Sequence, residues 1–140
     1  MRLRQIQAEW QRAQQALQAA ALLQTRGLAA DAISRAYYAT MHAAKAALLA
    51  QDVTAESHAA VRRLFGQILV QTGEIERAWA VVLARAHDRR TLADYSIDTV
   101  FSPEDTGQLV HDTHRFLAWI AHYLTSKDIV LEQSEERPPA

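Results

Sequence analysis

Apolar side chains recur along this chain at the three- and four-residue spacing of amphipathic α-helices. No segment shows the sustained alternation of apolar and polar residues that predicts a β-strand. Prolines occur only beyond residue 102 and the chain has 4 glycines, so few residues interrupt long helices. The sequence therefore predicts an all-α fold, an antiparallel up-and-down bundle of about five helices.

The ends of these helices are marked by residues that favour helix termini. Gly27 and Gly73 are expected to end the first and third helices, because glycine adopts the left-handed backbone that closes a helix. Thr54 is an expected N-cap of the third helix, and Ser102 and Asp105 an expected capping box for the last. The expected helices span about residues 3–26, 28–51, 55–72, 74–95 and 103–124.

One domain is expected, because the chain has 140 residues, of which 49% are hydrophobic, enough for a single core. Residues 1–126 should form a helical bundle. Residues 127–140 are mostly polar and acidic and are expected to form a loosely ordered tail. Within that tail, Ile129, Val130 and Leu131 are apolar enough to dock on the bundle.

Composition excludes several classes of function. Cysteine is absent, which excludes disulfides, thiolate zinc sites and cysteine nucleophiles. The net charge is -1, so any site for a polyanion must be a local patch. Residues 1–90 carry 12 basic and 7 acidic side chains, whereas residues 91–140 carry 3 basic and 9 acidic side chains.

No apolar stretch reaches the roughly 18 residues of a membrane span, so we expect a cytoplasmic protein without a membrane segment.

One face of the second helix carries side chains that could perform chemistry. Asp31, Arg35, Tyr38, His42 and Lys45 fall within an arc of roughly 80° on a helical projection. This polar stripe is separate from the apolar stripe of the same helix, which is expected to face the core. The expected core stripe consists of Ile33, Tyr37, Met41, Ala44 and Leu48.

Arg35 and His42 lie two helical turns apart, about 10 Å along the axis, with Tyr38 between them. An arginine can clamp a phosphate with two hydrogen bonds. A histidine titrates near neutral pH and can move a proton to or from a ribose hydroxyl or a leaving oxygen. Spacing alone nevertheless favours a solvated helix face, because polar stripes on amphipathic helices are common.

The fourth helix places Arg90 on its apolar face, where a guanidinium needs a partner. Asp94, one turn later, is the expected partner in an ion pair, and Tyr95 is a candidate to cover that pair. A role in lining a pocket is the alternative for Arg90. His58, in the first turn of the third helix, is expected to be a hydrogen-bonded histidine at the edge of the core.

Other motifs give little support for a metal or a cofactor. His111, His114 and His122 share one face of the last helix, but a solvated face explains them better than a metal site. No phosphate-binding loop, dinucleotide fingerprint or nucleophile elbow occurs in the sequence. We therefore expect no metal and no cofactor.

Several linked motifs together resemble a prokaryotic HEPN-domain family. The resemblance covers roughly residues 10–125. It implies an antiparallel helical bundle that is usually a homodimer, often encoded beside a minimal nucleotidyltransferase in toxin-antitoxin or defence pairs. The matching motifs are SRAYY at 34–38, MHAAK at 41–45, His58, LFG at 64–66, Thr72 with Gly73, and Arg90 with ADY at 93–95.

HEPN ribonucleases carry an arginine and a histidine separated by four to six residues, and six residues separate Arg35 from His42. The resemblance therefore implies that Arg35 and His42, with Tyr38, act in RNA cleavage, and that dimerisation brings two copies of this stripe together. Lys45 and Arg90 are further candidates for binding RNA or a nucleotide.

Besides a purely structural helical dimer, two functions stay open from the sequence. One is a metal-independent RNA-cleaving or RNA-binding toxin. The other is a non-catalytic dimer that binds a nucleotide or a nucleotidyltransferase partner. Ala36 favours the second function, because a polar residue commonly follows the arginine in HEPN ribonucleases.

Overall fold

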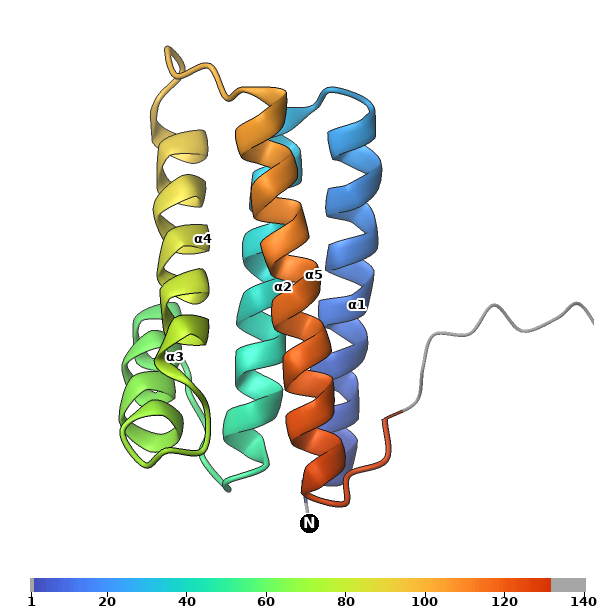
Figure 1. Ribbon diagram of the computed structural model, residues 1–140, viewed down its shortest axis with the longest axis vertical. Helices are drawn as coiled ribbons and strands as arrows, with labels where there is room; N and C mark the ends of the chain where they lie inside the picture. Colours follow the sequence, from blue (N-terminus) through green and yellow to red (C-terminus); the bar gives the residue numbers. More distant parts are fainter. Residues whose placement is uncertain (1, 132–140) are drawn as a thin grey trace, which may run out of the picture.

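The computed structural model describes residues 2–131 of the chain. Figure 1 shows four long helices that lie side by side and point in alternating directions along the chain, with a short helical segment beside the lower end of α4. No strand occurs in the described range, so the predicted all-α bundle is confirmed. The elements are α1 (Leu3–Thr25), α2 (Ala29–Leu49), α3 (His58–Leu64), the π-helix η1 (Phe65–Val70), α4 (Arg77–Tyr95) and α5 (Pro103–Ser126).

Helix α2 is the centre of the bundle, since α1, α4 and α5 all pack against it (Figure 1). Thirteen of its 21 residues are buried, and seven of those are alanines. The small alanine side chains let neighbouring backbones approach closely, so much of the surface of α2 is covered. All five residues of its expected core stripe are buried. Burial on α2 is wider than one stripe because this helix has neighbours on several sides.

The start of the third helix differs from the prediction. Ser57, not Thr54, is the N-cap: its backbone is extended and its hydroxyl accepts a hydrogen bond from the Ala60 amide at 3.0 Å. The Thr54 hydroxyl instead accepts a hydrogen bond from the Arg2 guanidinium. The expected single helix also changes into a π-helix at Phe65. A pattern of apolar residues does not distinguish these two helix types over one or two turns.

Helix α5 begins at the predicted cap, although half of the expected capping box is missing. The Ser102 hydroxyl accepts a hydrogen bond from the Asp105 amide at 3.0 Å, and Pro103 occupies the first turn. The Asp105 carboxylate binds the Arg89 guanidinium at 3.1 Å instead of turning back to the cap. A cation from α4 therefore takes the oxygen that a local motif would have used.

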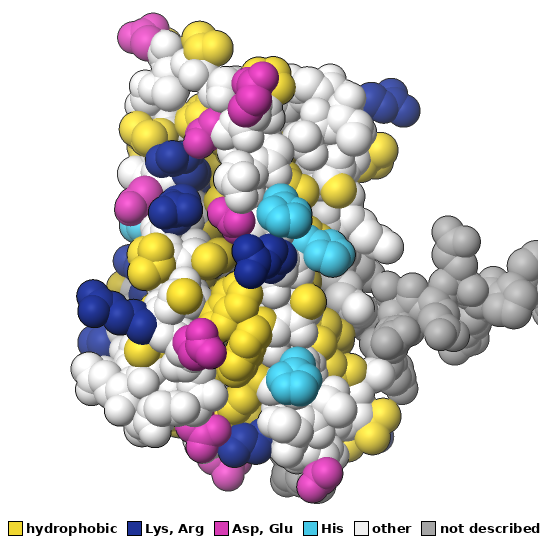
Figure 2. Space-filling view, in the orientation of Figure 1, with side chains coloured by type: hydrophobic (Ala, Val, Ile, Leu, Met, Phe, Trp, Pro, Cys, Tyr) yellow, Lys and Arg dark blue, Asp and Glu magenta, His cyan; other side chains and the backbone are white. Residues whose placement is uncertain are grey.

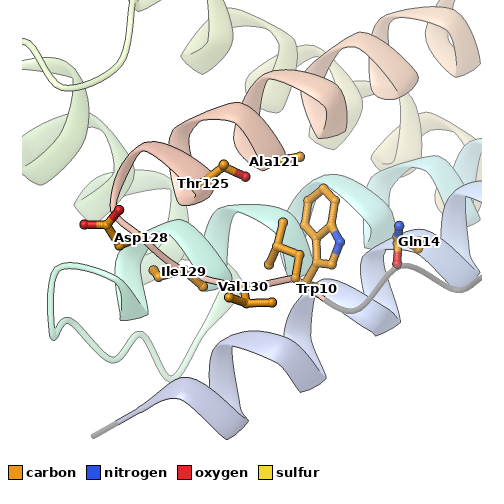
Figure 3. A pocket seen from close by; sticks show the side chains of 8 residues that line it. Trp10, Gln14, Ala121, Thr125, Asp128, Ile129 and Val130 are labelled. Atoms are coloured by element: carbon orange, nitrogen blue, oxygen red, sulfur yellow. The ribbon is translucent and has the colours of Figure 1, made fainter.

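The chain after α5 folds back along α1. The Gln7 side-chain amide donates a hydrogen bond to the Val130 carbonyl at 2.9 Å, and Ile129 and Leu131 pack against the core. Ile129, Val130 and Leu131 line a hollow of about 580 Å³ together with Trp10 of α1 (Figure 3). The expected loose tail was assigned to residues 127–140, of which 132–140 lie outside the described residues. None of the helices between residues 2 and 131 has the length and hydrophobicity needed to cross a membrane.

Candidate functional site

A groove between α1 and α2 brings the predicted site residues together. Arg35, Tyr38 and His42 of α2 line one side of a hollow of about 350 Å³. Arg12 lies on the other side, contributed by α1. The remaining lining residues, Gln15, Ala16 and Ala19, also come from α1. We call these seven residues the α1–α2 groove.

The imidazole of His42 is hydrogen-bonded within this region. Its Nδ1 lies 2.6 Å from Oε2 of Glu9 on α1, and each of the two side chains is about one-quarter exposed. Burial by itself raises the pKa of Glu9. The hydrogen bond to His42 and the charges of His42, Lys45 and Arg12 outweigh burial, so the pKa of Glu9 lies below its usual value. Glu9 is therefore a carboxylate at neutral pH.

Tyr38 links the groove to α4. The guanidinium carbon of Arg35 lies 5.5 Å from the centre of the Tyr38 ring, and that of Arg90 lies at the same distance. Arg90 also donates a hydrogen bond to the Tyr38 hydroxyl at 3.3 Å. The Tyr38 ring therefore contacts two permanent cations, and its electron-rich face attracts each of them.

The predicted ion pair between Arg90 and Asp94 is present, with Nε and Oδ2 2.8 Å apart. The N–H bond does not point directly at the carboxylate, so the contact is an ion pair without a well-aligned hydrogen bond. The Ser34 hydroxyl lies 3.5 Å from the other oxygen of Asp94. Tyr95 does not cover the pair, because its side chain is 84% exposed. It follows Asp94 directly on the helix and therefore points in another direction.

His58 is hydrogen-bonded at the edge of the core, as predicted. Its Nδ1 lies 2.9 Å from the Tyr37 hydroxyl, and Arg90 lies over the Tyr37 ring at 5.0 Å. Burial lowers the pKa of His58, and the positive charges of Arg90, Lys45, Arg62 and His42 lower it further. The sequence placed Tyr37 in the core but did not identify its hydroxyl as the partner of His58.

The structure separates two candidates from the groove. Lys45 lies one turn beyond His42 and lines an adjacent hollow together with Glu9. Arg90 reaches the groove only through Tyr38. The sequence missed Glu9 and Arg12, which sit three residues apart on α1. Both residues flank the buried stripe of Ile6, Trp10 and Ala13 on α1. Side chains that flank a buried stripe lie next to the neighbouring helix, so this position was the sequence signal that could have identified Glu9 and Arg12.

The three histidines of α5 are exposed on the outer face of that helix, where histidine side chains are visible in Figure 2. No group of three or more histidine, aspartate or glutamate side chains between residues 2 and 131 is arranged to hold a metal ion. An apolar band is also visible on this face (Figure 2). Trp119 packs at the edge of the core, stacked on Tyr123 and 6.0 Å from Trp79 between the ring centres.

Comparison with known proteins shows the family. The HEPN domain model matches residues 6–124. A protein of Methanocaldococcus jannaschii named "putative toxin" is 34% identical over 113 residues, which cover 81% of this chain and 84% of the relative. A second "putative toxin" of that organism is 26% identical over 94% of this chain and 90% of its own length. A UPF0332 protein of Gloeobacter violaceus is 34% identical over 81% of this chain and 90% of its own length. The chain therefore belongs to the HEPN domain family.

Proposed function

We propose that this HEPN protein is a toxin that binds RNA in the α1–α2 groove and cleaves it without a metal ion. The observation that carries this proposal is the convergence of Arg12, Arg35, Tyr38 and His42 on one hollow. Two relatives named as toxins support the biological role. The overall charge of the chain is -1, so a local basic groove is the surface to which RNA would bind.

Each side chain in the groove suits one part of an RNA backbone. Arg12 and Arg35 line the groove from different helices, so their guanidinium groups can bind one phosphate or two successive phosphates. The Tyr38 ring can stack on a base or a ribose. Lys45 in the adjacent hollow and Arg90 beside Tyr38 add positive charge near the groove. Affinity for RNA should therefore depend strongly on salt.

His42 is the residue that we assign to proton transfer. Its Nε2 takes the proton from a ribose 2'-hydroxyl, and the resulting oxygen attacks the adjacent phosphorus. The bond between phosphorus and the 5'-oxygen breaks, and that oxygen takes a proton from water. The hydroxide that remains takes the proton from Nε2 of the imidazolium, which returns His42 to its starting form. Arg35 stabilises the negative charge that builds up on the phosphate oxygens. The products are a 2',3'-cyclic phosphate and a 5'-hydroxyl.

The position after Arg35 does not weaken this assignment. Ala36 is fully buried, so its side chain faces the core and not the groove. A polar residue at this position would have to be accommodated among apolar neighbours, which is costly without a hydrogen-bond partner. Ala36 therefore does not line the groove, and the assignment rests on Arg35, Tyr38 and His42.

A second candidate function is a non-catalytic dimer that binds a nucleotide or a nucleotidyltransferase partner. Tyr38 favours it, because a ring with cations at 5.5 Å on Arg35 and Arg90 offers both stacking and phosphate contacts to a single nucleotide. In a homodimer, two such sites could form one composite surface. This function needs no proton transfer by His42.

Cleavage of RNA by the purified protein distinguishes the two candidates. We would compare the wild type with Arg35→Ala and His42→Ala in the presence of EDTA and identify the ends of the products. Arg26→Ala and His122→Ala are matched controls, since both residues are exposed and lie outside the groove. Cyclic phosphate ends that are lost only in the two groove variants would support the nuclease. Equal cleavage by all proteins, or none, would reject it.

A further inference from the structure

We propose that Glu9 is a positioning residue for His42, holding the proton on Nδ1 so that the bare Nε2 faces RNA in the groove. This inference rests on the proposed function, in which His42 transfers a proton. It adds a residue from α1 to a site that the sequence placed entirely on α2 and α4. The structural basis is the 2.6 Å contact between Glu9 Oε2 and His42 Nδ1.

The contact is held by the packing of α1 on α2. Trp10, which follows Glu9 directly, is 4% exposed, and Ile6 and Ala13 are buried on the same face of α1. These side chains fix the rotation of α1 about its axis, because turning the helix would expose them to water. The Glu9 side chain is therefore kept beside α2, at the level of His42, by residues that have no chemical role.

The charge state of Glu9 determines what it can do to the imidazole. The hydrogen bond with His42 and the positive charges of Lys45 and Arg12 favour the ionised carboxylate, so Glu9 is charged at neutral pH. An ionised carboxylate only accepts hydrogen bonds, so the imidazole nitrogen that faces it must carry the proton. In a neutral histidine the other nitrogen then has no proton and can act as a base.

Glu9 also favours the form of His42 that exists after proton transfer. When Nε2 takes a proton, the imidazole becomes a cation, and the Glu9 carboxylate already lies 2.6 Å from its Nδ1. This arrangement is similar in physical principle to the aspartate that orients the histidine of a serine protease, where the carboxylate sets the tautomer and stabilises the cation. The cost of the arrangement is a negative charge beside a groove that is expected to bind a polyanion.

That cost provides a test, because removing the charge should affect binding and cleavage in opposite directions. Glu9→Gln keeps the size of the side chain but removes its charge and lets it donate as well as accept. We expect RNA to bind as tightly as to the wild type or several-fold more tightly, since repulsion of phosphate is lost. We expect cleavage at saturating RNA to fall about tenfold or more, since the imidazole is no longer held in one tautomer.

Nitrogen NMR of the full chain, labelled on its histidine rings, tests the positioning without any cleavage assay. In the wild type, neutral His42 should carry its proton on Nδ1. In Glu9→Gln the signals should shift towards a mixture of the two tautomers, and Glu9→Asp should retain part of the wild-type preference. Glu76→Gln is the matched control, because it removes the same charge from an exposed position before α4.

The possible outcomes separate this inference from the proposed function. If neutral His42 carries its proton on Nε2 in the wild type, or if Glu9→Gln leaves the tautomer unchanged, Glu9 does not position it. Stronger cleavage by Glu9→Gln would also overturn the inference, because Glu9 would then act only by repelling RNA. If the wild type cleaves no RNA, the proposed nuclease fails, and the NMR result still decides whether Glu9 sets the tautomer.

Discussion

The hydroxyl of Tyr37, in the middle of α2, lies 2.9 Å from Nδ1 of His58 in the first turn of α3. The rings also contact each other edge to face, with their centres 5.4 Å apart. Tyr37 is completely buried, so its hydroxyl has little access to water as an alternative partner. This hydrogen bond therefore satisfies a buried polar group and at the same time fixes where α3 begins relative to α2.

Removing this hydroxyl should destabilise the protein. Tyr37→Phe leaves Nδ1 of His58 without its partner, and we expect a loss of about 1–2 kcal/mol in the free energy of unfolding. Urea denaturation followed by circular dichroism measures the loss. Tyr95→Phe is the control, because this tyrosine is 84% exposed and its variant should stay within about 0.5 kcal/mol of the wild type. Equal stability of both variants would show that the hydrogen bond contributes nothing.

Stability should fall with acidification in two steps. The pKa of His58 is lowered in the folded protein, so below about pH 6.5 the unfolded chain takes up this proton first and unfolding becomes more favourable. The pKa of Glu9 is also lowered in the folded protein. The Glu9 carboxylate therefore stabilises the fold above the pKa that Glu9 has in the unfolded chain. This stability is lost as the pH falls through the lower pKa of Glu9 in the folded protein, which is a more acidic range than that of His58.

Two variants test which residue causes each of these two losses of stability. His58→Gln keeps a group that can bond to the Tyr37 hydroxyl but cannot titrate, so the loss that begins near pH 6.5 should become smaller. Glu9→Gln should reduce only the step at lower pH. Unfolding by urea at a series of pH values provides the measurement. An unchanged pH profile in His58→Gln would contradict the assignment of the first step.

The ion pair of Arg90 and Asp94 should contribute less than the other contacts of Arg90. Both side chains are about one-third exposed or less, and pairs of this kind on a helix contribute up to about 1 kcal/mol. Arg90 also packs over Tyr37 and Tyr38, so Arg90→Ala should cost more than Asp94→Ala. A double-mutant cycle of unfolding free energies measures the coupling. Equal costs for the two single variants would contradict the role of the tyrosine contacts.

The cap of α5 gives a prediction that depends on one hydroxyl. Ser102→Ala removes the acceptor for the Asp105 amide and should lower the free energy of unfolding by about 1 kcal/mol. Ser102→Asp supplies another acceptor at the same place and should restore most of this stability. Thermal unfolding of the three proteins is sufficient to compare them. If the aspartate variant is as unstable as the alanine variant, the side-chain acceptor is not the cause.

Arg12 should contribute to RNA binding although the sequence did not single it out. Arg12→Ala should weaken binding of a single-stranded RNA and reduce the slope of log affinity against log salt by about 1, as expected for the loss of one phosphate contact. Arg26→Ala, outside the groove, should leave the slope unchanged. The same slope in all three proteins would remove Arg12 from the proposed binding site.

The pattern of residues along the chain was sufficient to predict the fold class and the relative placement of residues within each helix. The spacing of apolar residues predicted α2 with its buried stripe, and local rules predicted the Ser102 cap. The pairing of Arg90 with Asp94 also followed from spacing, because residues four apart on a helix are neighbours. Arg35, Tyr38 and His42 share a groove for the same reason. Each of these relationships lies within a single helix.

The tertiary structure decided every relationship between helices. It placed Glu9 against His42, Tyr37 against His58 and Asp105 against Arg89. Periodicity shows which face of a helix is buried, but the height of one helix against the next and its rotation depend on how all side chains pack together. The third helix illustrates the same limit, since its cap and its π-helical end depend on contacts outside the local sequence. A helix pattern therefore predicts neighbours along one helix, whereas partners on different helices emerge only when the bundle is assembled.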